Sequence, residues 1–218
     1  MKSRALGAEF IGSAVLAATV IGSGIAAQNL SGGNVAIALL ANAIATGCIL
    51  YVIISVFGPL SGAHFNPAVS IAFAIRRELS WPQCGLYTIV QVMGMIAGAW
   101  LAHAMFDLPI FQTSTTIRAG TGKAIAEFVA TFGLVLTILA LKEKNAAQIP
   151  AAVALYITSA YWFTSSTSFA NPAITTARSL SDTFAGIAPA SVPIFIVCQL
   201  AGMSAAVTLG AWLFKPSS

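Results

Sequence analysis

The chain has 218 residues, of which 58% are hydrophobic and only 7% are charged, and its formal net charge is +4. Soluble domains carry charges at roughly a quarter of their positions, so this chain has too few charged groups to cover a surface that faces water. A mean hydropathy of +0.88 indicates instead that a lipid bilayer is its solvent. The small positive charge is not the footprint of a nucleic-acid-binding protein, and no nucleic acid is expected as a partner.

Six apolar runs have about the length that crosses a bilayer, for which a helix needs about 20 residues. In chain order they cover residues 6–27, 35–57, 81–105, 123–141, 150–163 and 191–214. The fifth run is short. The first contains Glu9 and is long for the apolar part of a cleaved leader, so we expect it to remain as a membrane span. The pattern predicts an all-α membrane protein with six transmembrane helices.

The charged residues cluster between these runs and predict the orientation of the chain. If both termini are cytoplasmic, the inner side carries Lys2, Arg4, Arg76, Arg77, Lys142, Lys144 and Lys215. The outer side then carries Arg118, Lys123 and Arg178. Cytoplasmic loops hold the excess of Lys and Arg. We therefore expect a multi-pass protein of a cell membrane (the inner membrane in a Gram-negative cell) with cytoplasmic N- and C-termini.

Three landmarks recur in the same order in both halves of the chain. They are Ala-Glu-Phe at 8–10 and 126–128, Gln-x-x-Gly-Met at 91–95 and 199–203, and Asn-Pro-Ala at 66–68 and 171–173. Because each half holds three spans, the second copy must enter the membrane from the opposite side. This predicts a single domain over residues 1–218 that is an inverted repeat of about 1–110 and about 118–218.

Each half also carries one acid inside an apolar run, Glu9 and Glu127. An ionisable residue within a span is a functional hypothesis by default. One interpretation is a proton relay. The other, which we favour, is that each carboxylate satisfies loose backbone groups of a non-helical segment inside the bundle.

The two Asn-Pro-Ala segments follow polar, turn-rich stretches at 58–64 and 164–168. Such backbone survives at membrane depth only when it is buried in protein or lines a watery cavity. Asn is favoured just before a helix, and Pro suits the first helical position. We therefore expect two re-entrant half-helices, at about 67–76 and 172–181, whose starts are formed by Asn66, Pro67, Ala68, Asn171, Pro172 and Ala173.

Half-helices that enter from opposite sides would bring their N-termini together near the bilayer midplane. The positive ends of the two helix dipoles would then repel cations at that point. The side-chain amides of Asn66 and Asn171 could donate hydrogen bonds to a passing oxygen and so form the centre of a pore. The alternative is that both segments are capped helix starts with no role in a pore.

The segment 61–69, SGAHFNPAV, resembles the first signature of the aquaporin, or major intrinsic protein, family almost letter for letter. The Glu landmarks and the second Asn-Pro-Ala resemble that family too. The resemblance implies six spans with two half-helices, a pore in every subunit, and a homotetramer in the lipid bilayer. It also implies that His64, beside the first motif, supports the loop.

The resemblance implies an outer constriction in which this chain departs from the family pattern. The family usually has Arg three residues after the second Asn, and here that position is Ile174. The other constriction positions, carried over by spacing, are Thr46, Ser159 and Ser168. Such a ring is wider and less polar than a water-selective one, so we expect it to pass solutes larger than water.

Arg178 lies one helical turn beyond Ile174 and has two interpretations. It could sit in the outer vestibule, where it would attract anions or donate hydrogen bonds. Alternatively, it could be a surface residue paired with Asp182 at i+4 spacing. The ion pair is favoured.

The stretch 165–182 resembles bacterial aquaporins associated with arsenic resistance, which also tend to have an aliphatic residue in place of the Arg. This resemblance implies a passive channel for arsenous acid or other neutral metalloids, methylated arsenicals, glycerol and some water. Alternatives are a general water, glycerol and urea facilitator, or a proton-coupled transporter that uses the two acids. With two His and three Cys dispersed along the chain, no enzyme, metal site or cofactor is expected.

Overall fold

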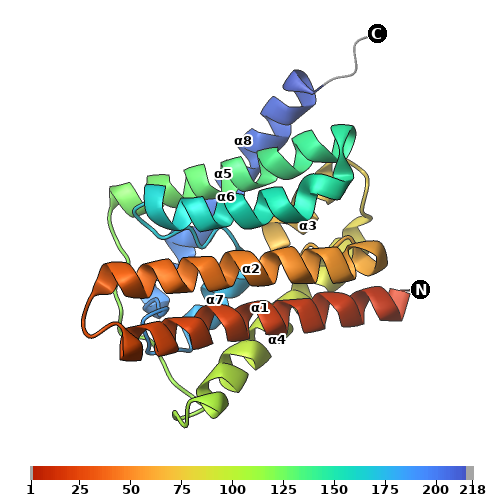
Figure 1. Cartoon of the computed structure of the whole chain (residues 1–218). Coiled ribbons are helices and arrows are strands. Elements are labelled where there is room, and N and C mark those ends of the chain that lie inside the picture. Colours follow the sequence, from red (N-terminus) through yellow and green to blue (C-terminus); the bar gives the residue numbers. More distant parts are fainter. Residues whose placement is uncertain (1, 215–218) are drawn as a thin grey trace.

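The computed structural model describes residues 2–214, so the expected inner Lys215 lies outside the described residues. Six long helices form a bundle (Figure 1): α1 Lys2–Leu30, α2 Val35–Ser61, α4 Trp81–Met105, α5 Thr121–Lys144, α6 Ile149–Phe163 and α8 Val192–Leu213. Two short helices are α3 Pro67–Ile75 and α7 Pro172–Arg178. Single 3-10 turns, η1 Ala146–Gln148 and η2 Pro189–Ser191, precede α6 and α8. The predicted all-α architecture, with six spans and two half-helices, is confirmed.

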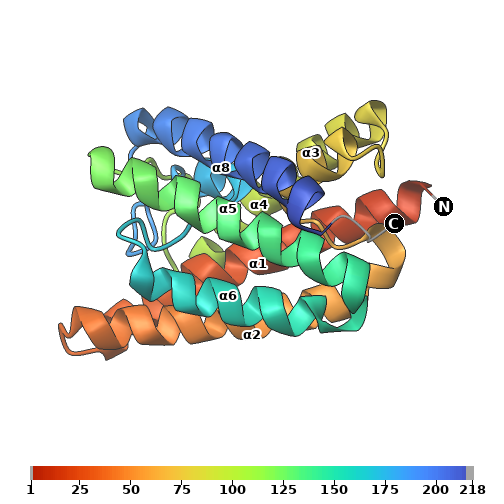
Figure 2. The same ribbon diagram turned by 90° about the horizontal axis from the view of Figure 1, so that it is seen from above.

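Five of the six long helices are long and apolar enough to cross a membrane. The sixth, α6, has 15 residues, in agreement with the short fifth run of the sequence. Helix α2 ends at one end of the bundle and α6 at the other, so the half-helices that follow them enter from opposite ends (Figure 2). The start of α1 and the end of α8 lie at the same end, toward which α3 also lies.

Both half-helices begin where the sequence predicts and for the expected physical reason. Asn66 has an extended backbone, and its side-chain oxygen accepts a hydrogen bond from Ala68 N. The side-chain oxygen of Asn171 likewise accepts hydrogen bonds from Ala173 N and Ile174 N. Each is followed by a proline at the first helical position, where a missing N–H leaves nothing unpaired. Helix α7 is shorter than expected, because it ends at Arg178 rather than at residue 181.

Small residues let the long helices approach closely within each half. A Cβ atom added to Gly94 of α4 would lie 2.3 Å from the carbonyl oxygen of Phe10 in α1. At the equivalent place in the second half, a Cβ on Gly202 of α8 would lie 2.2 Å from the carbonyl oxygen of Phe128 in α5. Helices pack at such distances in membranes through small residues at the contact. The two pairs, α1 with α4 and α5 with α8, thus form the same way in both halves.

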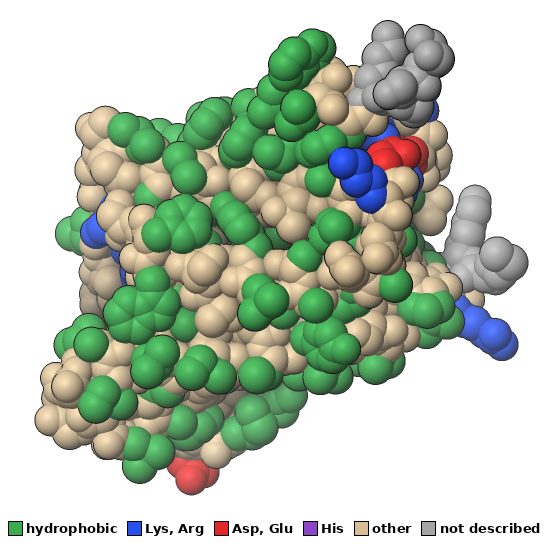
Figure 3. All heavy atoms as spheres, turned by 45° about the horizontal axis from the view of Figure 1, so that its top comes forward, with side chains coloured by type: hydrophobic (Ala, Val, Ile, Leu, Met, Phe, Trp, Pro, Cys, Tyr) green, Lys and Arg blue, Asp and Glu red, His purple; other side chains and the backbone are tan. Residues whose placement is uncertain are grey.

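The outer surface of the bundle suits a lipid environment. Large apolar side chains such as Ile37, Leu155 and Val197 are at least half exposed. Figure 3 shows apolar side chains spread over the side of the bundle, with charged side chains gathered near its ends. A surface of this kind is stable in hydrocarbon, and the chain is a multi-pass membrane protein.

Candidate functional site

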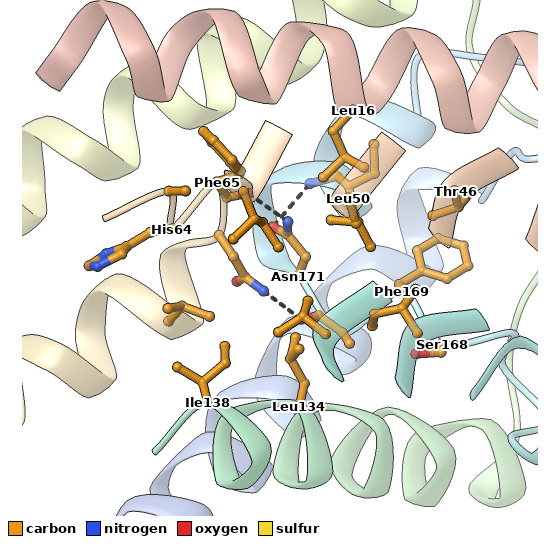
Figure 4. Close-up of a pocket in the computed structure, with 18 of the residues that line it drawn as sticks. Leu16, Thr46, Leu50, His64, Phe65, Leu134, Ile138, Ser168, Phe169 and Asn171 are labelled. Atoms are coloured by element: carbon orange, nitrogen blue, oxygen red, sulfur yellow. Dashed lines mark hydrogen bonds between the residues drawn. The ribbon is translucent and has the colours of Figure 1, made fainter. Parts of the chain in front are cut away.

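A cavity of about 110 Å³ lies inside the bundle. Its walls come from α1, α2, α5 and α6, from the half-helices α3 and α7, and from the two loops that precede these half-helices. Most of the lining is aliphatic, as with Leu16, Leu50, Leu134 and Ile138 in Figure 4. In that view Asn171 lies near the middle of the cavity, between the ends marked by His64 and by Thr46, Phe169 and Ser168.

At the middle of this cavity, Asn66 and Asn171 each donate a hydrogen bond to a backbone carbonyl of the opposite loop. The Asn66 amide donates to the carbonyl oxygen of Ala170 at 2.8 Å, and the Asn171 amide donates to that of Phe65 at 2.8 Å (Figure 4). A side-chain amide has two N–H donors. Each Asn therefore uses one N–H donor in the bond to the opposite loop, and its second N–H can bind a molecule in the cavity. Both side chains stand at the N-terminus of a half-helix.

The two loops also share an unusual backbone. Ala63 and Ser168, each three residues before its Asn, have φ angles of 50° and 51°. Phe65 and Ala170, each one residue before its Asn, have φ angles of 48° and 49°. This left-handed conformation is unfavourable for residues with a Cβ and persists only where surrounding contacts impose it. The sequence repeat therefore extends to the backbone conformation of the loops.

Glu9 supplies those contacts in the first loop. One of its oxygens accepts hydrogen bonds from the Ser61 hydroxyl at 2.6 Å and from His64 N at 3.0 Å. The other accepts from Phe65 N at 2.7 Å and from the Gln91 amide at 2.8 Å. The carboxylate is fully buried and accepts only from neutral groups here, which disperse its charge.

Glu127 makes the equivalent contacts in the second loop. It accepts from Phe169 N and Ala170 N, both at 2.9 Å, and from the Gln199 amide at 2.5 Å. Gln199 also donates to the Thr175 hydroxyl, as the glutamine of the first half does to a serine. Neither glutamate is among the residues that line the cavity, so each acts on the cavity through the loop it holds.

His64 lies in the lining of the cavity and packs between two aromatic rings. Its ring centroid is 4.6 Å from that of Phe73 and 5.5 Å from that of Tyr87. Its Nδ1 lies 3.1 Å from the Ser70 hydroxyl, which also accepts a hydrogen bond from the Gln91 amide. These contacts fix the imidazole against the first loop.

At the other end of the cavity, the structure brings together three of the four residues assigned to the outer constriction. Thr46, Ser168 and Ile174 all line the cavity and are buried. The Thr46 hydroxyl lies 3.2 Å from the Tyr161 hydroxyl, so Tyr161 of α6 joins this ring. The Ser168 hydroxyl has no hydrogen-bond partner among the described residues.

The assignment of Ser159 to this ring is wrong. Ser159 lies on the exposed face of α6, and its hydroxyl donates to the carbonyl oxygen of Tyr156. The α6 residues that face the cavity include Ile157 and Tyr161, four positions apart. Successive helical residues are about 100° apart, so a residue midway between these two points to the opposite side. Counting residues back from Asn171 does not predict this helical phase.

The expected ion pair between Arg178 and Asp182 is also wrong. Arg178 is 3% exposed and lines the cavity, and its Nε donates to the carbonyl oxygen of Ala185. The guanidinium carbon lies 3.3 Å from the centroid of the Phe169 ring. Asp182 instead accepts hydrogen bonds from the backbone and side chain of Thr115. Since α7 ends at Arg178, the helical i+4 geometry that the pair requires does not exist.

A second arginine, Arg118, also lies near Phe169, with its guanidinium carbon 5.2 Å from the ring centroid, and it donates to backbone carbonyls. Arg118 donates from Nε to the carbonyl oxygen of Gly186 at 2.7 Å and from Nη2 to that of Phe184 at 3.3 Å. Burial lowers the pKa of its guanidinium, against the attraction of Glu127. An arginine nevertheless stays protonated at neutral pH.

The family model described as Major intrinsic protein matches residues 1–165, which is more than half of the chain. The chain belongs to the major intrinsic protein family. The aquaglyceroporin AqpS of Rhizobium meliloti is 50% identical over 182 residues, which are 84% of this chain and 78% of AqpS. Aquaporin NIP6-1 of Arabidopsis thaliana is 28% identical over 66% of this chain, and the match spans 47% of that plant relative.

A solved structure supports the fold of this major intrinsic protein. The aquaglyceroporin from Plasmodium falciparum superposes with a TM-score of 0.75 and 21% identity, and the match covers 99% of this chain and 98% of that one. The resemblance to the aquaporin family seen in the sequence is confirmed by the family model and by AqpS. Members of the family are channels without enzymatic activity, so this major intrinsic protein is a membrane channel and not an enzyme.

Two residues of the cavity in this family member were missed by sequence reasoning. The Tyr161 hydroxyl lies within hydrogen-bond distance of the Thr46 hydroxyl, and the Phe169 ring stacks against the Arg178 guanidinium. Tyr161 lies in an apolar run, where an aromatic residue is more often a core or lipid-facing residue. Phe169 follows the polar stretch 164–168, and no motif in the sequence singles it out.

Proposed function

We propose that this protein is a passive channel for small uncharged solutes that cross the membrane down their gradients. The observation that carries the proposal is the composition of the cavity wall. Two Asn amides stand at the N-termini of two half-helices within an otherwise mostly aliphatic wall, and no Asp or Glu is among the described residues that line it. Such a wall offers hydrogen bonds to a neutral polar molecule but no carboxylate to a cation.

We further propose that the solutes are larger than water. They are arsenous acid and other neutral metalloids, methylated arsenicals and glycerol, and some water passes as well. Ile174 and Thr46 at the outer end give a less polar ring than one with Arg at the first of these positions. Arsenous acid is neutral at pH 7 and resembles glycerol in the layout of its polar groups. The relative AqpS is itself named an aquaglyceroporin.

A proton-coupled transporter has little support from the geometry. Glu9 and Glu127 would have to release and take up protons in contact with the solute path. Their oxygens are instead occupied by backbone and side-chain donors, and neither residue lines the cavity.

The arrangement in the cell is also part of the proposal. We propose one channel domain over residues 1–218 with repeats at about 1–110 and about 118–218, assembled as a homotetramer in the cell membrane. The excess of Lys and Arg on the side of α3 favours cytoplasmic termini.

The test is stopped-flow light scattering on proteoliposomes of the purified protein, with gradients of water, glycerol, urea and arsenous acid. We expect glycerol and arsenous acid to enter at least about tenfold faster than into empty liposomes. Rapid urea flux without a preference for arsenous acid would favour the general facilitator. Rapid water flux with exclusion of every larger solute would contradict the proposal.

The variant Ile174→Arg sharpens this test, because it places a long polar side chain where the cavity wall is now aliphatic. We expect the ratio of water to glycerol permeability to rise about tenfold or more, which corresponds to roughly 1.4 kcal/mol in relative barrier height. Unchanged relative permeabilities would contradict a place for Ile174 in the constriction.

A further inference from the structure

We propose that Arg178 is the cation barrier of the outer constriction and the hydrogen-bond donor that orients solute oxygens there. The inference deepens the proposed channel function and depends on it. Among the described residues that line the cavity, Arg178 is the single Arg or Lys. It is fixed in α7 one helical turn after Ile174, so its side chain and that of Ile174 lie on the same side of the half-helix.

The position of the guanidinium is imposed by its neighbours. Its carbon atom lies 3.3 Å from the centroid of the Phe169 ring, and its Nε donates to the carbonyl oxygen of Ala185. A cation over an aromatic face at this distance is held by the ring electrons. The loop that presents Phe169 is in turn fixed by Glu127, which accepts from Phe169 N at 2.9 Å. A buried arginine held on two sides has little freedom to leave the wall.

Its charge and most of its donors remain available to the cavity. A guanidinium has five N–H donors, and the described residues accept one hydrogen bond from that of Arg178. No carboxylate of residues 2–214 lies within ion-pair distance of it. Since no ion pair neutralises the charge, the field of the guanidinium acts on whatever enters the constriction, and it acts strongly in a medium of low dielectric constant.

The surroundings of Arg178 also define how a solute would lie. The Ser168 hydroxyl is buried, lines the cavity and has no hydrogen-bond partner among the described residues. Ser168 and Arg178 are polar members of the cavity wall, whereas Ile174 is an apolar one. A polyol or a neutral hydroxide would place its oxygens against the two polar side chains and apolar surface against Ile174. A cation would meet an unpaired positive charge with no carboxylate to compensate.

The experiment compares the parent protein with Arg178→Gln, Arg178→Lys and the control Lys123→Gln in proteoliposomes. Lys123 lies at the start of α5, outside the cavity lining, so its replacement removes one positive charge at the same end of the bundle. The proton leak is measured with a pH-sensitive dye under an imposed potential, and glycerol flux is measured by light scattering. We expect about a tenfold larger leak for Arg178→Gln, and leaks within about twofold of the parent for Arg178→Lys and for the control.

An equal leak in Arg178→Gln and the parent, with glycerol flux retained, would overturn the inference. So would an equal increase in Arg178→Gln and Arg178→Lys, because that result would indicate a role in packing rather than in charge. If the parent moves no glycerol faster than empty liposomes do, the proposed function fails, while the leak comparison still reports on Arg178.

A second measurement needs no folded variant at position 178. Methylglyoxal reacts with accessible guanidinium groups, and peptide mass spectrometry locates the products. In the parent protein we expect Arg178 to be modified, and molar glycerol to slow its modification at least about threefold without affecting the exposed Arg77. Modification of Arg77 alone, or equal rates at Arg178 with and without glycerol, would overturn the inference.

Discussion

Single residues of this channel act mostly through backbone that they hold in place. Glu127 accepts hydrogen bonds from two consecutive backbone N–H groups, at Phe169 and Ala170, just before the second Asn. Glu9 does the same at the equivalent positions of the first loop. Without these acceptors, the left-handed residues of each loop would have buried, unpaired amides beside them. The two acids therefore shape the cavity without lining it.

We predict that Glu127→Ala destabilises the protein more than Glu127→Gln does. The alanine leaves three buried donors without an acceptor, and each unpaired donor costs about 1–3 kcal/mol. The glutamine keeps one side-chain carbonyl oxygen as an acceptor. Thermal unfolding in detergent measures the difference. Equal melting temperatures for the parent and Glu127→Ala would contradict the supporting role.

A second prediction for a single residue concerns Asn171 at the start of α7. In Asn171→Asp, a carboxylate would face the carbonyl oxygen of Phe65, to which the amide now donates at 2.8 Å. We expect a weaker contact between the loops and a proton leak about tenfold above that of the parent, because a negative charge replaces a neutral donor at the helix N-terminus.

The matched control for this variant is Asn34→Asp, since Asn34 caps α2 at an exposed position outside the cavity lining. Asp caps helices as well as Asn does, so this control should resemble the parent. A dye-based proton flux assay compares them. An equal leak in Asn171→Asp and the control would contradict a place for Asn171 at the pore centre.

At the scale of the elements, the long helices fix where the half-helices sit. In each half, one pair of helices approaches so closely that a backbone carbonyl of the first touches a glycine of the second. The glutamine that binds each acid comes from the same helix as that glycine, three residues before it. The close packing of the two helices therefore sets the distance between the glutamine and the glutamate that it hydrogen-bonds. That distance in turn sets the position of the loop that the glutamate holds.

Gly94→Ala should separate α1 from α4 and weaken this arrangement. The added Cβ would lie 2.3 Å from the backbone oxygen of Phe10, which no side-chain rotation can relieve. We expect a loss of about 1–3 kcal/mol in unfolding free energy, as for other overpacked sites. Gly85→Ala in the same helix is the control, because a Cβ there meets nothing within 4 Å. Similar melting temperatures for the two variants would show that the contact does not limit packing.

At the scale of the whole molecule, a cluster of charges joins the two halves at one end of the bundle. Arg76, at the end of α3, binds Glu143 of α5 at 2.7 Å and Glu78 at 2.9 Å. Lys142 of α5 binds Glu78 at 2.6 Å. Burial alone would raise the pKa of the Glu78 carboxyl, but hydrogen bonds from Lys142 and Arg76 lower it below its ordinary value. The charged form of Glu78 is thus favoured in the folded protein.

Glu78→Gln should reduce stability at neutral pH and have no effect at low pH. Because folding lowers the pKa of Glu78, its contribution is present above the unfolded-state pKa and disappears as the pH falls through the folded-state value. Exposed ion pairs contribute about 0–1 kcal/mol, so we expect a difference of about 1–3 °C in melting temperature at pH 7. Added salt should shrink it. A difference that persists at pH 3 would contradict an electrostatic origin.

The sequence by itself determined the elements of this channel and their order. Runs of apolar residues gave the six spans, and the Asn-Pro pairs located the starts of α3 and α7 because capping and proline geometry are local effects. The sequence also predicted that each acid satisfies loose backbone groups of a non-helical segment, but it did not predict that the glutamine of the same half joins this contact.

Only the tertiary structure decided which side chains face the cavity. In a membrane channel both the lipid-facing and the cavity-facing sides of a helix are apolar, so hydrophobic periodicity carries no information about helical phase. For that reason the sequence assigned Ser159 to the constriction instead of Tyr161. Similarly, the burial of Arg178 against Phe169 depends on where α7 ends and on how the following loop folds back to Ala185, which are set by contacts distant in sequence.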